Sequence, residues 1–91
     1  MKNEPVSLNK ESFMSLKVGH GLRVIKNGDR KDEFWTVKSD PTTSGDIPKV
    51  LVLSSKEKLP RFVHLFDDKL ITDDNGVICD FRDGDQLSIE T

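Results

Sequence analysis

Hydrophobic and polar residues alternate with the two-residue period of a β-strand in two runs near the start of the chain. In the run 21–26, Leu22 and Val24 share one face, and the run 33–38 alternates in the same way. The Asn-Gly step at 27–28 and the charged residues that follow it favour a turn between the two runs. The pattern therefore predicts a β-hairpin with a loop longer than two residues.

A short helical pattern precedes this hairpin. Phe13 and Leu16 are three residues apart and fall on one face of a helix predicted at 10–17. Asn9 is a suitable N-cap for that helix, and Gly19 is a suitable stop. Because a helix of this length is marginal in water on its own, we expect tertiary packing to hold it.

The rest of the chain has the pattern of short strands separated by turns. A continuous apolar run, Val50–Leu53, follows a proline-containing loop at 40–48 and predicts a central strand covered on both faces, with the helix as one cover. A loop and then a short strand or turn are predicted up to 62–66, and turns at 73–76 and 82–85 separate the strands of a meander. Together these elements predict a mainly β (small α+β) fold, an SH3-like or OB-like small barrel of about six short strands with one short N-terminal helix.

The length and composition suit one small domain, residues 1–91, in which residues 1–8 are predicted to be a flexible N-terminal tail. The single cysteine, Cys79, excludes an intramolecular disulfide. No apolar stretch approaches the roughly 18 residues that span a bilayer, and the opening residues lack the apolar region of a secretory signal. We therefore expect a cytoplasmic protein with no membrane partner.

The net charge of −2 is unevenly distributed along the chain. Residues 1–49 contain nine Lys/Arg and seven Asp/Glu, whereas residues 50–91 contain five Lys/Arg and nine Asp/Glu. A nonspecific DNA-binding protein is usually distinctly basic, and a protein that mimics DNA is far more acidic than this chain. The composition excludes both extremes and leaves the partner undecided between protein and nucleic acid.

The residues that could bind a metal or act in catalysis do not form a recognisable motif. His20, His64 and Cys79 lie singly in separate predicted elements, whereas structural zinc sites usually bring close pairs of ligands together. Asp80 is next to Cys79, and an acidic neighbour raises a thiol pKa, which favours an inert cysteine. Since no Ser/His/Asp signature and no phosphate-binding loop is present, we predict no enzyme activity, no metal and no cofactor.

One segment, FWTVKSDPTTSGDIPKVLVLSS at 34–55, resembles the opening of the MazF/PemK family of ribonuclease toxins. In that family a strand ends in Asp-Pro, a glycine-containing loop follows, and an Arg-Pro step leads into an apolar strand. Here Ile47 precedes Pro48 where the family has its catalytic arginine, and Lys49 follows. The resemblance implies an SH3-like barrel and, as an alternative function, a small toxin that cuts single-stranded RNA.

The predicted hairpin is the first candidate binding surface. Its cations stand beside two adjacent aromatic residues, and one of these must face outward if the other faces the core. Phosphates attract cations and bases stack on rings, so this combination suits single-stranded nucleic acid, although acidic neighbours also fit a plain solvated tip. The candidate residues of this surface, called the hairpin 26–38, are Lys26, Arg30, Lys31, Phe34, Trp35 and Lys38.

The second candidate surface is acidic and lies in the predicted turns of the second half. Aspartate is common in turns for local reasons, yet an acidic face could also steer a basic protein partner. Its members, called the acidic face, are Asp67, Asp68, Asp73, Asp74, Asp83 and Asp85.

The sequence therefore predicts a non-enzymatic binding or regulatory module that contacts a macromolecular partner through the hairpin 26–38. The partner is a protein or a nucleic acid. A protein-interaction adaptor or inhibitor that uses the acidic face is the alternative, and two copies could pair through an unpaired sheet edge.

Overall fold

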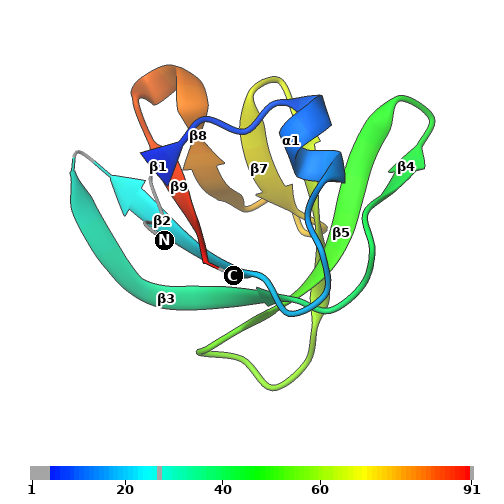
Figure 1. Cartoon of the computed structure of the whole chain (residues 1–91), viewed down its shortest axis with the longest axis horizontal. Helices are drawn as coiled ribbons and strands as arrows, with labels where there is room; N and C mark the ends of the chain where they lie inside the picture. Colours follow the sequence, from blue (N-terminus) through cyan, green and yellow to red (C-terminus); the bar gives the residue numbers. More distant parts are fainter. Residues whose placement is uncertain (1–4, 27, 91) are drawn as a thin grey trace.

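Nine β-strands, one five-residue α-helix and one 3-10 turn make up the computed structural model, which describes residues 5–26 and 28–90 (Figure 1). The elements are β1 (Pro5–Val6), α1 (Lys10–Met14), β2 (Gly21–Lys26), β3 (Asp29–Val37), β4 (Thr42–Ser44), β5 (Ile47–Ser54), β6 (Arg61–Phe66), β7 (Lys69–Thr72), β8 (Val77–Asp80), η1 (Phe81–Asp83) and β9 (Gln86–Glu90). The prediction of a mainly β chain with one short helix is confirmed.

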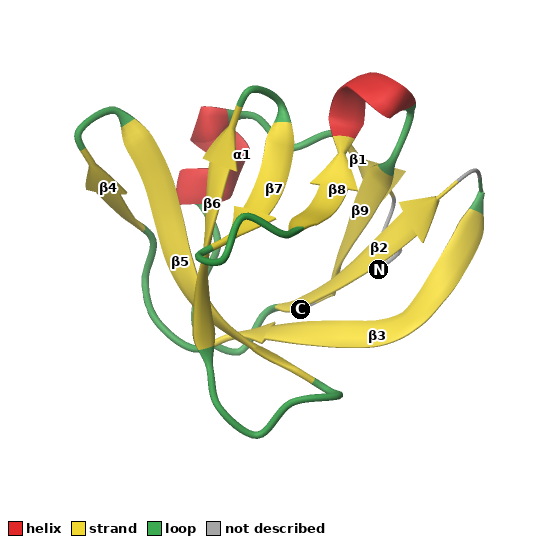
Figure 2. Ribbon diagram, turned by 180° about the vertical axis from the view of Figure 1, so that it is seen from behind, coloured by secondary structure: helices red, strands yellow, loops and turns green. Residues whose placement is uncertain are grey.

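All strands belong to one antiparallel sheet with the order β1-β9-β2-β3-β5-β6-β7-β8, and β4 pairs with β5 beside this path. The sheet is strongly curved, and β3 bends along its length (Figure 2). The turn η1 connects β8 directly to β9, and across this turn the Asp85 N–H donates to the Asp80 carbonyl oxygen at 3.2 Å. No strand ladder joins β8 to β9 or β1 within residues 5–26 and 28–90, so the sheet is not closed.

The hairpin at 21–37 has a tighter turn than its sequence predicts. Lys26 pairs with Asp29, so only the two residues 27–28 connect β2 to β3, and the expectation of a longer loop was wrong. Gly28 has a φ of 82°, which an L-residue rarely adopts, and Asn27 lies outside the described residues. The charges after the turn are therefore on a strand, and a β-bulge between Arg23 and Ile25 shifts the register there.

The hydrophobic core lies between the concave side of the sheet and α1. Asn9 caps the helix as predicted, in a reciprocal pair with Ser12, but α1 ends at Met14 instead of residue 17. The core residues include Leu8, Phe13, Leu16, Leu22, Val24, Trp35, Val37, Val50, Val52, Val63, Leu70, Cys79 and Leu87.

The central strand β5 is covered on one face only, which corrects the expectation of two buried faces. Val50 and Val52 point into the core and are almost completely buried, whereas Leu51 and Leu53 are only partly buried on the opposite face. Figures 1 and 2 view the molecule from opposite sides and place α1 on one side of β5, β6 and β7. A short helix can cover only one face of a sheet, and in the described part of the chain no helix lies on the other face of these three strands.

The beginning of the chain is held more firmly than a flexible tail at 1–8 would be. Val6 pairs with Leu87, so β1 extends the sheet beyond β9. Leu8 is 3% exposed and belongs to the hydrophobic core. Residues 1–4 lie outside the described part of the chain, so the tail prediction differs from the structure at residues 5–8.

Candidate functional site

The two aromatic residues of the hairpin 26–38 are not free rings. Trp35 faces the core and is 7% exposed. Phe34 faces outward, but its ring lies over Gly21, where a Cβ would collide with it, and the Arg23 guanidinium lies 5.2 Å from its centroid. Arg23 is fixed there, because it also donates to the Lys31 carbonyl oxygen at 2.8 Å. Neither ring offers an open face for a base.

Most of the charge on the hairpin 26–38 is neutralised within the molecule. Lys26 lies 2.6 Å from Asp85, and Arg30 lies 3.8 Å from Glu90. Lys31 and Lys38 are exposed and have no salt bridge among the described residues. The structure thus gathers the predicted hairpin residues on two neighbouring strands, but it leaves only two of the four cations free.

The pair formed by Lys26 and Asp85 is the most buried ion pair among the described residues. The Asp85 side chain is 5% exposed and also accepts a hydrogen bond from the Asp80 N–H at 2.9 Å. Burial alone would raise the pKa of Asp85, but the hydrogen bonds from Lys26 and from the Asp80 N–H outweigh it and lower this pKa. The hydrogen bond to Asp85 correspondingly raises the pKa of Lys26.

A cleft of about 360 Å³ separates the hairpin from β8, at the place where the sheet stays open. Its walls carry ammonium groups of Lys26, Lys31 and Lys56 together with carboxylates of Asp32 and Glu33. Because both signs are mixed, the cleft does not select an anion or a cation by charge.

Several aspartates of the acidic face form salt bridges with arginine residues that lie among them. Arg82 binds Asp67 at 2.9 Å and Asp68 at 3.1 Å, and Arg61 binds Asp74 at 3.3 Å. Asp85 is buried against Lys26, which removes it from the surface. Asp73 and Asp83 are exposed without a salt bridge in the described part of the chain. The six aspartates therefore do not form one continuous acidic surface.

The side of β5, β6 and β7 opposite α1, called the outer face, presents the most exposed aromatic side chains of the described residues. Phe62 is 41% exposed and Phe66 is 54% exposed, and His64 lies between them on the same side of β6. The core takes the alternate residues of this strand, Val63 and Leu65. We call Phe62, His64 and Phe66 the β6 ladder.

The neighbouring strands add aliphatic and basic side chains to the outer face. Leu51 on β5 pairs with Phe62, while Lys49 on β5 and Ile71 on β7 flank His64 in one row. The Lys49 ammonium lies 4.9 Å from the centre of the Phe62 ring. The outer face is therefore apolar and aromatic with a basic component.

Beside His64 the outer face is hollowed. The hollow measures about 240 Å³ and is lined by Ser44, Ile47, Lys49 and His64, so β4 forms its far wall. It offers a hydroxyl, an imidazole and an ammonium group next to an aliphatic side chain. The chemistry suits a polar ligand with hydrogen-bonding edges.

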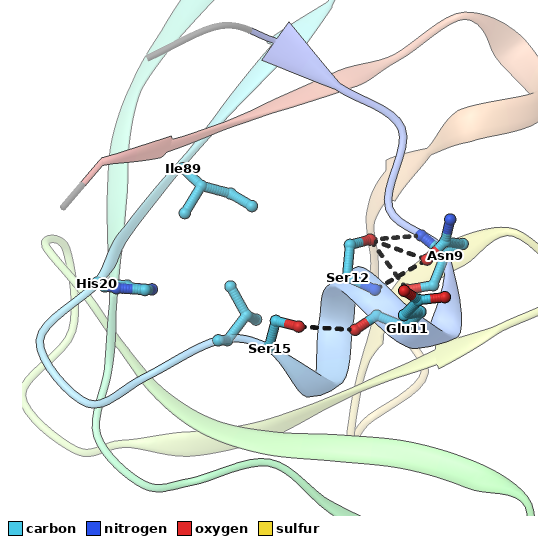
Figure 3. Close-up of a pocket in the computed structure, with 7 residues that line it drawn as sticks. Asn9, Glu11, Ser12, Ser15, His20 and Ile89 are labelled. Carbon is cyan, nitrogen blue, oxygen red and sulfur yellow. Dashed lines mark hydrogen bonds between the residues drawn. The ribbon is translucent and has the colours of Figure 1, made fainter. Parts of the chain in front are cut away.

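A larger hollow of about 480 Å³ lies between α1, His20 and Ile89 (Figure 3). Its polar groups are engaged locally: the Ser15 hydroxyl donates to the Glu11 carbonyl oxygen at 3.1 Å, and Ser12 pairs with Asn9. The Lys17 N–H donates to His20 Nδ1 at 3.2 Å. This hollow contains no hydrogen-bonded pair of a nucleophile and a base among the described residues.

Cys79 is fully buried in the core, and its thiol donates weakly to the Gln86 carbonyl oxygen at 3.7 Å. Burial is the main cause that raises its pKa to about 12, and the negative charge of Asp85 adds to it. Within residues 5–26 and 28–90 no three His, Cys, Asp or Glu side chains are grouped as metal ligands.

We therefore expect native Cys79 to resist a thiol reagent such as a disulfide-exchange chromophore at pH 8, because the thiolate is the reactive form. The reaction should become fast once denaturant unfolds the chain. A stopped-flow absorbance measurement checks this, with the unfolded protein as its own control. Rapid stoichiometric labelling of the native protein would contradict the buried placement.

Comparison with known proteins finds no protein-family model, no curated protein and no solved structure that matches this chain. The resemblance of residues 34–55 to the MazF/PemK family therefore rests on that segment alone. Its cation Lys49 is on the outer face beside Phe62. In the described residues no helix is long and apolar enough to cross a membrane.

The β6 ladder was not among the residues singled out from the sequence. Pro60 made the segment before this strand ambiguous, because proline breaks a helix and the residues around it did not distinguish a loop from a strand. The signal that could have found the ladder is the alternation Phe-Val-His-Leu-Phe at 62–66, in which every second residue is aromatic.

Proposed function

We propose that this protein is a non-enzymatic binding module that contacts a macromolecular partner through its outer face. The observation that carries the proposal is the β6 ladder, whose two phenylalanine rings are about half exposed on a sheet face that no other described element covers. Monomeric proteins seldom leave large apolar side chains grouped at the surface unless they serve an interaction. Phenylalanine is also among the aromatic residues that are enriched in the cores of interfaces.

The outer face is better suited to this role than the surfaces that the sequence suggests. Rings on the hairpin 26–38 are buried or covered by Arg23, and two of its four cations are paired. The acidic face is divided by Arg61 and Arg82. Both surfaces remain alternatives, as does pairing of two copies through a sheet edge.

The fold itself is proposed to be a partly open small barrel of the SH3-like or OB-like kind. Two features support this assignment: the strong bend of β3, and the contacts that bring β8 against β9 near the end of the sheet. Small barrels of this kind commonly bind ligands on an exposed sheet face.

The test compares variants as bait in a pull-down from native lysate, with captured proteins and nucleic acids both analysed. The double variant Phe62→Ser/Phe66→Ser should lose the specific partner. The matched control Leu59→Ser should keep it, because Leu59 is even more exposed, at 78%, but lies in the loop before β6.

A third bait, Arg30→Ala/Lys31→Ala, separates the outer face from the hairpin 26–38. If this bait loses the partner and the Phe62/Phe66 variant retains it, the outer face is not the binding surface. Specific cleavage of single-stranded RNA without added metal, lost in Lys49→Ala, would instead support the ribonuclease alternative.

A further inference from the structure

The β6 ladder has a spacing that matches a chain of nucleic-acid bases. Alternate residues of an antiparallel strand are about 6.8 Å apart, twice the roughly 3.4 Å rise per nucleotide of a stacked strand. The repeat along β6 therefore equals the distance at which one base fits between two parallel rings. Phe62, His64 and Phe66 all lie on the outer side of β6, and both phenylalanines are exposed.

From this geometry we infer that the outer face binds single-stranded nucleic acid, with bases stacked along the β6 ladder. The inference rests on the proposed function and names the class of its partner. Stacking on aromatic side chains is tolerant of sequence, because every base has a flat π-face. A duplex keeps its bases stacked inside and cannot use the ladder in this way.

The charges around the ladder complement a phosphate backbone. Lys49 has no salt bridge within residues 5–26 and 28–90, and only the Phe62 ring holds its ammonium, at 4.9 Å. Its flexible stem lets the ammonium leave the ring for a phosphate when a base takes its place. Lys38, whose N–H donates to the Leu51 carbonyl oxygen, is exposed on the neighbouring side of the same face.

A third cation stands at the other end of the ladder. Lys69 on β7 pairs with Phe66 on β6. The Lys69 ammonium lies 4.0 Å from the Asp67 carboxylate, which is a weak contact, and the Arg82 guanidinium lies closer to the same carboxylate, at 2.9 Å. Cations thus flank both ends of the row of rings. This combination of rings and flanking cations is what a single strand requires.

The hollow beside His64 adds hydrogen-bonding groups to the stacking surface. Ser44, Lys49 and His64 line it. These groups can bind the edge of a base or a sugar hydroxyl next to the stacked rings. The hollow therefore adds a recessed, hydrogen-bonding part to a surface that would otherwise be a flat apolar patch.

The same charges disfavour a second copy of this chain as the occupant. A twofold symmetric contact through the outer face would place the surface of one copy against the identical surface of the other. Lys49 and Lys38 of one copy would then approach the same two cations of the other copy, which opposes association.

The binding experiment uses fluorescence anisotropy with labelled oligo-uridine and oligo-thymidine of about 12 nucleotides, and with a duplex of equal length, over a series of salt concentrations. The native chain should bind both single strands and should bind the duplex more weakly. Phe62→Leu and Phe66→Leu should each weaken single-strand binding about 5- to 150-fold, with an unchanged salt slope, because stacking releases no counterions.

Lysine variants have a different expected signature. Lys49→Ala should reduce the log–log salt slope by about 0.7, the value for one phosphate contact on a single strand. Lys10→Ala is the matched control, because Lys10 is exposed on α1, and it should leave both affinity and slope unchanged. Circular dichroism of every variant shows that the fold is retained.

The outcomes separate this inference from the proposed function. Absence of single-strand binding at low salt, with a pull-down partner still lost in Phe62→Ser/Phe66→Ser, would make the occupant a protein and overturn only the inference. If the pull-down is also insensitive to those substitutions, the proposed function fails as well. Equal binding of duplex and single strands, unaffected by the leucine variants, would likewise overturn stacking on the ladder.

Discussion

Val52→Asp should abolish the cooperative folding of this domain. Val52 is completely buried among the apolar residues of the core, where a carboxylate would lose its hydration. Burying an unpaired ionised or polar group costs several kcal/mol, against a total stability of about 5–15 kcal/mol for a typical domain. Urea denaturation followed by tryptophan fluorescence and circular dichroism measures the effect.

Leu51→Asp is the matched control for this substitution. Leu51 is the adjacent residue of β5, but it faces the partly exposed outer face, where a carboxylate stays hydrated. We expect a loss of only about 1–2 kcal/mol, from weaker strand propensity and partial loss of apolar burial. Equal loss of structure in both variants would show that β5 is covered on both faces after all.

Asp85→Ala should produce the second large effect. Removing one partner of a buried ion pair lowers the free energy of unfolding by about 3–5 kcal/mol, and we expect a value near the lower end of this range. The substitution leaves the Asp80 N–H without its acceptor and Lys26 without its carboxylate. The loss lies near the lower end because the Lys26 side chain is 40% exposed and can be hydrated. Thermal and urea unfolding of the variant measure it.

The exposed neighbour Asp83 is the control for Asp85, since Asp83→Ala removes the same charge from the same turn without breaking a buried pair. That variant should change stability by less than about 0.5 kcal/mol. A small effect in both variants would show that the pair of Lys26 and Asp85 contributes nothing net.

The same ion pair predicts a pH dependence with a defined sign. Because folding lowers the pKa of Asp85, its contribution is present above the unfolded pKa of about 3.9 and is lost as the pH falls through the folded pKa. Folding raises the pKa of Lys26, so that contribution is complete below about pH 10.4 and is lost as the pH rises through the folded pKa. Stability differences between the native chain and Asp85→Ala should therefore be largest between about pH 5 and 9.

Local patterns along the chain determined much of the secondary structure. Asn9 capped the predicted helix because capping depends on a few neighbouring residues. Alternation predicted that Leu22 and Val24 share one face, and both belong to the core, but only the structure decided that Trp35 faces inward and Phe34 outward. The two-residue turn was missed because the pairing of Lys26 with Asp29 depends on the register of two strands.

The candidate binding residues could not be chosen from the sequence, because exposure and charge pairing depend on residues far apart in the chain. Lys26 looked like a free cation until the fold brought it to Asp85, 59 residues away. Phe34 looked like a free ring until Arg23 on the paired strand covered it.

The sequence by itself determined a mainly β chain with one short capped helix, because strand period and capping act over a few residues. The tertiary structure decided which faces of the strands are open. Its single short helix covers one side of β5, and the other side leaves Phe62 and Phe66 at the surface. The sheet has two faces, and the apolar residues of the core cover only one of them. The position of the proposed binding surface therefore depends on packing and not on any local motif.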